Sequence, residues 1–83
     1  MRYIFMCRSL TYAQSAARLL EKNAISASVR KAPAGLGVGG CSYGVSVAYA
    51  RGTAAAEILR RESQLRGKVF LRREDGSYTE VIL

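Results

Sequence analysis

The chain has 83 residues, of which 49% are hydrophobic and 23% charged, and its 13 Lys and Arg against 6 Asp and Glu give a net charge of +7. This length predicts one domain, residues 1–83, and the composition is that of a globular chain rather than a disordered one. The absence of histidine excludes Ser-His-Asp triads, Cys-His nucleophile pairs and Cys/His zinc sites. Two cysteines cannot complete a tetrahedral zinc site, so we expect neither a metal ion nor another cofactor.

The apolar segments are short. No apolar run approaches the ~18 residues of a membrane span, and the apolar stretch that begins at Tyr3 is too short for the core of a signal peptide. We therefore expect a cytoplasmic protein without a membrane partner. The net charge favours anionic partners, such as nucleic acid, a phosphate-bearing ligand or an acidic protein surface. Because the charged residues do not form one block in the sequence, a basic surface without a specific partner is the favoured interpretation.

The first half of the chain predicts strand, helix, strand. Arg2 to Arg8 is a strand with two apolar faces, which predicts a place in the middle of a sheet. A helix follows to about Asn23, with Thr11 opening it through a Thr-x-x-Gln capping box. Ile25 to Lys31 alternates weakly and predicts an edge strand. The spacing of small and apolar residues predicts that the buried face of the helix consists of Ala13, Ala16, Ala17 and Leu20.

The second half adds a loop and four further elements. Ala32 to Gly40 is glycine-rich and predicts a loop, and Ser42 to Tyr49 alternates clearly as a strand. A second helix is predicted from Gly52 to about Gln64. Lys68 to Arg72 and Tyr78 to Leu83 are predicted strands, joined by an Asp-Gly turn. This order indicates an α+β fold: a ferredoxin-like βαββαβ antiparallel sheet with two helices on one face, plus an extra C-terminal strand.

That topology brings the two cysteines to one edge of the sheet. Cys7 ends the first strand and Cys41 begins the third, beside the glycine-rich loop and the start of the first helix. A helix N-terminus and nearby cations favour a thiolate, and the cations expected at this edge are Arg8, Arg30 and Lys31. Cys41 is therefore the candidate reactive thiol. We expect Cys7 to pack in the core, with a role as a second thiol as the alternative.

The glycine-rich loop contains a literal G-x-G-x-x-G match that begins at Gly35. Dinucleotide binding needs a helix after the last glycine, and the next predicted element is a strand, so we exclude a Rossmann site. Backbone N–H groups at Gly37, Gly39 and Gly40 could still form an anion-binding nest. The alternative is that the loop is only a flexible connection.

One set of features covers residues 1 to about 65: a short first strand, a helix led by Thr11, a second strand ending before Pro33, and a cysteine between the small-residue loop and the third strand. In these features the chain resembles the Se/S carrier protein-like family of small bacterial proteins. The resemblance implies a carrier that holds sulfur or selenium on Cys41 as a persulfide or its selenium analogue, with Pro33 shaping the loop and with protein donors or acceptors as partners. Ala34 and Ser42 stand where the family pattern has arginine and glycine.

Two other functions stay open. An RNA-recognition-motif-like module has the same element order, but the predicted third strand holds Val45 and Ala48 where such domains have aromatic residues. A homodimer through the helix-free sheet face is the other, because Ile4, Met6 and Phe70 would make that face apolar. A hydrolytic enzyme is disfavoured, since none of the six carboxylates is expected near the cysteines.

Overall fold

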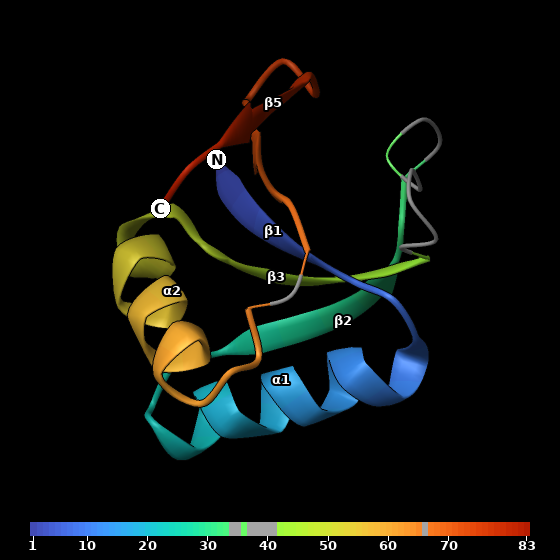
Figure 1. The fold of residues 1–83 in the computed structure, drawn as a ribbon. Helices are drawn as coiled ribbons and strands as arrows, with labels where there is room; N and C mark the ends of the chain where they lie inside the picture. Colours follow the sequence, from blue (N-terminus) through green and yellow to red (C-terminus); the bar gives the residue numbers. More distant parts are fainter. Residues whose placement is uncertain (34–35, 37–41, 66) are drawn as a thin grey trace.

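The computed structural model describes residues 1–33, 36, 42–65 and 67–83, which form an α+β fold of two layers (Figure 1). The five strands make one antiparallel sheet in the order β2-β3-β1-β4-β5, and both α-helices lie on the same side of it. The α+β class, the antiparallel sheet and the pair of helices are thus as predicted. In the described part of the chain, no helix is long and apolar enough to cross a membrane. The elements in chain order are β1 (Arg2–Cys7), α1 (Leu10–Lys22), β2 (Ala27–Lys31), β3 (Tyr43–Ala48), the 3-10 helix η2 (Tyr49–Arg51), α2 (Gly52–Arg61), β4 (Val69–Arg72) and β5 (Tyr78–Val81).

Strand β1 lies in the interior of the sheet, between β3 and β4, as its two apolar faces predicted. Phe5 pairs with Val45 of β3 on one side and with Val69 of β4 on the other. Strand β2 forms one edge of the sheet, also as predicted, and β5 forms the other. Because paired residues of neighbouring strands share a face, each such row lies wholly on the helix-covered face or wholly on the open face.

The core lies between the sheet and the two helices. The helix face predicted from the sequence is confirmed, because its three alanines and Leu20 are all buried. On α2, Ala55 and Leu59 are buried, and Ile58 of the helix and Leu65 beyond its end are partly buried against the same core. The largest fully buried side chains are Phe5, Leu20, Ile25, Val45, Val47 and Leu59.

Helix α1 begins earlier than predicted, and its cap is Ser9 rather than Thr11. The Ser9 hydroxyl accepts a hydrogen bond from the Tyr12 backbone N–H at 3.3 Å, and Ser9 itself is extended, with φ −145° and ψ 165°. The expected capping box was therefore wrong, because β1 ends at Cys7 and the connection is short enough to place Ser9 at the N-cap.

We expect Ser9→Ala to lower the free energy of unfolding by about 1 kcal/mol, because the side-chain cap on the first turn of α1 is lost. Thr11→Ala is the matched control: Thr11 is an exposed residue inside the first turn, and its replacement should change stability by less than about 0.5 kcal/mol. Urea unfolding followed by circular dichroism measures both values. A larger loss for Thr11→Ala than for Ser9→Ala would contradict this assignment of the cap.

Both helices end in the same way, at residues that are not glycine. Ala24 and Ser63 have φ of 62° and 59°. The Ala24 N–H bonds to the Glu21 carbonyl at 3.1 Å and the Ile25 N–H to the Leu20 carbonyl at 2.9 Å. This is a Schellman motif, and the same pair of bonds recurs after α2, from Ser63 to Arg60 and from Gln64 to Leu59. The motifs explain why β2 begins at Ala27 instead of Ile25 and why α2 ends at Arg61 instead of Gln64.

The C-terminal hairpin of β4 and β5 forms through the Asp-Gly turn predicted from the sequence. Gly76 has φ of 88°, its N–H bonds to the Arg73 carbonyl at 3.0 Å, and the Arg73 N–H bonds to the Ser77 carbonyl at 2.8 Å. Glycine adopts this left-handed conformation without steric cost. The hairpin extends the sheet beyond β1, so that β4 and β5 contribute to its open face.

Candidate functional site

The end of the sheet that carries Cys7 gathers the segments that the sequence predicted there. Cys7 pairs with Tyr43 of β3, Lys31 of β2 pairs with the same residue, and the Ala32 N–H bonds to the Ser42 carbonyl at 2.8 Å. Helix α1 begins three residues after Cys7. The candidate thiol Cys41 and the candidate nest of Gly37, Gly39 and Gly40 lie outside the described residues.

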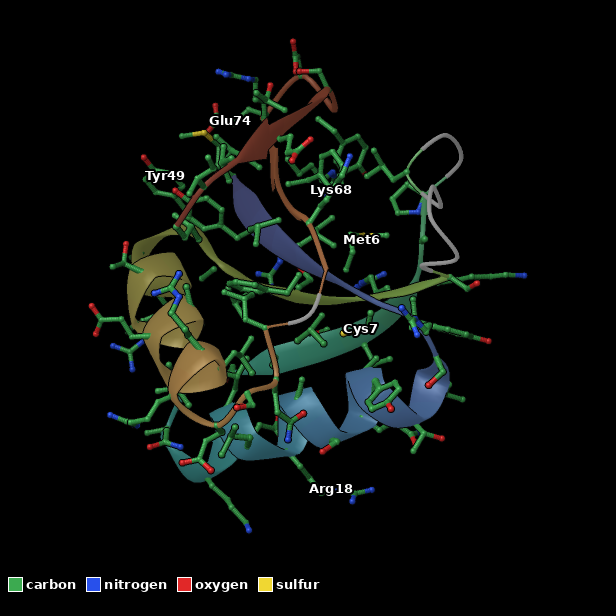
Figure 2. All side chains as sticks on the ribbon, in the orientation of Figure 1. Met6, Cys7, Arg18, Tyr49, Lys68 and Glu74 are labelled. Carbon is green, nitrogen blue, oxygen red and sulfur yellow. The ribbon has the colours of Figure 1, made fainter. Side chains whose placement is uncertain are left out.

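Cys7 is a core residue. It is 6% exposed, belongs to the core cluster, and its thiol donates to the Phe5 carbonyl at 3.7 Å. Figure 2 shows Cys7 on the side of β1 that faces α1 and Met6 on the opposite side. The predicted packing role of Cys7 fits this burial, which also keeps the thiol from direct contact with a protein donor.

The three cations expected beside the cysteines, Arg8, Arg30 and Lys31, do not all line one site. Arg30 and Lys31 line a pocket on the open face of the sheet, whereas Arg8 is exposed and is not among the residues that line it. Two further arginines line the same pocket, Arg2 at the start of β1 and Arg72 at the end of β4. Sequence reasoning missed both, although Arg2 and Arg72 pair directly across β1 and β4, because the register of these strands was not predicted.

This open-face pocket has a volume of about 320 Å³. Its floor is formed by Ile4, Gly44 and Ser46 from the central strands, and its lining also includes Pro33 and Tyr78. The Arg2 Nε donates to the Ser46 hydroxyl at 2.6 Å, and the Arg2 Nη2 donates to the Ser46 carbonyl at 3.2 Å. Of the described residues that line the pocket, four are cationic and none is a carboxylate. Arg2, Arg30 and Arg72 occupy open-face register positions, so the chemistry of the pocket suits an anion.

The open face is less apolar than the sequence suggested. Ile4 and Met6 lie on this face, as their pairing with Ser46 and Gly44 requires, but they are only 8% and 2% exposed. The expectation of an exposed apolar face for dimerisation was therefore wrong for these two residues. Phe70 is partly buried on β4, and beside it Lys68 forms an ion pair with Glu80 at 3.6 Å.

The pKa values of Tyr3 and Asp75 are shifted, and neither residue lines the pocket. Burial, with the adjacent Tyr49 hydroxyl as a second cause, raises the pKa of Tyr3, whose ring stacks on that of Tyr49 at a centroid distance of 5.3 Å. Hydrogen bonds from Ser77 lower the pKa of Asp75 in the hairpin turn. Among the described residues, no group of three His, Cys, Asp or Glu side chains could hold a metal ion.

The fold and the pocket define an α+β protein with a five-stranded antiparallel sheet and a basic cavity on its open face. Comparison with protein-family models, with curated proteins and with solved structures found no match to this chain.

Proposed function

We propose that this protein is a carrier of sulfur or selenium that holds the atom on Cys41, and that it is not a turnover enzyme. The observation that carries the proposal is the position of Cys41 in the sequence, between the glycine-rich segment and β3, as in the family that the chain resembles. The thiolate would attack the outer sulfur of a donor protein's persulfide. The donor's S–S bond breaks, the donor leaves as a thiolate, and Cys41 becomes the persulfide without net oxidation. A selenium-bearing donor would react in the same way.

The described neighbours of Cys41 support this chemistry. Ser42, which follows Cys41 in the chain, is held beside Ala32 by its carbonyl oxygen, and Ala32 directly follows the two cations Arg30 and Lys31 of β2. Positive charge near a cysteine favours its thiolate, which is the form that attacks a persulfide. Cys7 is buried against α1, so the proposal gives the carrier role to Cys41 and a packing role to Cys7.

Treatment with a protein persulfide donor should add about 32 Da to the wild-type chain, the mass of one sulfur atom, and this adduct should be absent from Cys41→Ser. Cys7→Ala is the matched control and should still take up the sulfur. Intact-mass spectrometry measures the adduct. Iodoacetamide should also alkylate Cys41 at a lower pH than an ordinary cysteine, whose pKa is about 8.5.

An adduct that persists in Cys41→Ser and disappears in Cys7→Ala would refute the proposal. So would a wild-type chain that takes up no sulfur or selenium and is alkylated like an ordinary thiol. Loss of the adduct in both variants would indicate a disulfide-linked pair and would count against a single carrier thiol.

We propose a ferredoxin-like domain extended by β5, which is supported by the order β2-β3-β1-β4 and by both helices lying on one face. We propose a cytoplasmic location, which would keep the Cys41 thiol reduced.

An RNA-recognition-motif-like function would place base-stacking rings on the open face of the two central strands. Those positions of β1 and β3 hold Arg2, Ile4, Met6, Gly44, Ser46 and Ala48, none of which is aromatic. The absence of such rings at these positions counts against the nucleic-acid module.

A further inference from the structure

We propose that the open-face pocket binds a small phosphate-bearing molecule, with Arg2, Arg30 and Arg72 contacting its phosphate group. This site is separate from the carrier proposal, because it is built from described residues on the strands and does not use either cysteine. The ligand class follows from three properties of the pocket: its charge, the fixed geometry of Arg2, and its size.

The pocket carries an excess of positive charge. Arg2 and Arg72 lie directly opposite each other on β1 and β4, an arrangement in which like charges destabilise a sheet. Arg30 approaches from β2, where it pairs with Gly44, and no Asp or Glu is among the described residues that line the cavity. Glu74 lines a smaller adjoining pocket with Arg2 and Arg72, so one carboxylate lies beside three arginines. Glu80 of β5 is already paired with Lys68. An anion between the arginines would offset this repulsion and form charge-assisted hydrogen bonds, which are about twice as strong as neutral ones.

Arg2 is positioned before any ligand arrives. Its Nε and Nη2 atoms donate to the Ser46 hydroxyl and carbonyl, and Ser46 is only 5% exposed. These bonds use two of the five N–H groups of the guanidinium, so that the others can contact an oxyanion without a further loss of side-chain freedom. Arginine offers the flat, forked geometry that matches phosphate oxygens.

The size and the apolar surfaces of the pocket indicate a small molecule. A volume of about 320 Å³ lies near the lower end of the roughly 300–1,000 Å³ typical of ligand pockets. Ile4, Pro33 and the Tyr78 side chain offer surfaces for a compact ring beside the phosphate. A nucleic-acid strand would instead need stacking rings on β1 and β3, which these strands do not carry.

Phenyl phosphate, which combines one phosphate with one ring, is a suitable probe. Titrated at constant ionic strength, it should bind saturably, with amide shifts in a ¹H–¹⁵N spectrum concentrated on Gly44, Ser46 and Arg72. Arg30→Gln and Arg72→Gln should each weaken the affinity about tenfold, since each removes a charge-assisted contact. Arg61→Gln is the matched control: it removes the same charge from the exposed end of α2 and should leave the affinity within twofold of wild type.

Three results would overturn the inference. The first is no saturable binding of phenyl phosphate or inorganic phosphate at ~10 mM. The second is an equal loss of affinity in Arg61→Gln and Arg72→Gln, which would mean that only net charge matters. The third is binding of a single-stranded oligonucleotide without binding of phenyl phosphate. Cys41→Ser should bind phenyl phosphate as wild type does, so failure of the carrier proposal would leave this inference intact.

Discussion

Replacing Leu20 by alanine should lower the free energy of unfolding by about 2–5 kcal/mol. Leu20 is completely buried on α1, in the core that joins this helix to the sheet and to α2. Its loss removes apolar burial and leaves a cavity, because the surrounding close-packed side chains relax only partly. A chain of 83 residues has a total stability of about 4–12 kcal/mol, so this one substitution removes a large share of it.

The same helix provides the control. Leu10 is 41% exposed at the start of α1, and Leu10→Ala should cost less than about 1 kcal/mol. Urea unfolding compares the two variants, and an unchanged dependence on urea concentration would show that the loss is one of native-state stability. If Leu20→Ala does not fold, Leu20→Met should still do so with a loss below about 1.5 kcal/mol. Equal losses for Leu20→Ala and Leu10→Ala would contradict the proposed core.

The face of each element could be predicted from the sequence because side-chain burial follows the helix and strand periods. The small-residue stripe of α1 is such a pattern, and all four residues that it identified are buried. The two apolar faces of β1 predicted its interior position for the same reason. These predictions depend on local spacing alone.

Two helix boundaries were predicted correctly, because α1 ends with Asn23 as its C-cap and α2 begins at Gly52. The end of α2 was missed because Ser63 adopts the left-handed conformation that usually belongs to glycine, and only its backbone hydrogen bonds reveal the motif. The cap at Ser9 was missed because a better-matching pattern began at Thr11.

The open-face pocket also depends on contacts between distant segments. Arg2 and Arg72 are 70 positions apart and meet only because β4 pairs with β1 in one particular register. A change of one residue in that register would move Arg72 to the other face. The predicted anion site therefore included Arg30 and Lys31, which line the pocket, but lacked the two arginines opposite them.

Gly44→Ala should both destabilise the fold and weaken ligand binding at the pocket. A Cβ atom at Gly44 would lie 2.6 Å from the Ile4 Cγ2 and 3.5 Å from the Met6 Sδ, so Ile4 must move. Ile4 is a buried, β-branched side chain on the pocket floor, with little rotamer freedom. We expect a loss of about 1–3 kcal/mol in the free energy of unfolding from this overpacking. Phenyl phosphate should also bind more weakly, because the added methyl group and the displaced Ile4 side chain would reduce the volume of the pocket.

The cause can be isolated by changing Ile4 as well. Ile4→Ala removes the Cγ2 atom, so Gly44→Ala should cost much less in that background, with a coupling energy of about 0.5–3 kcal/mol. Ile4→Val keeps Cγ2 and is the matched control: in that background the full cost of Gly44→Ala should remain. Unfolding in urea gives the energies, and titration with phenyl phosphate gives the affinities. If the cost of Gly44→Ala is the same in all three backgrounds, the close approach of β3 to Ile4 does not shape the floor of the pocket.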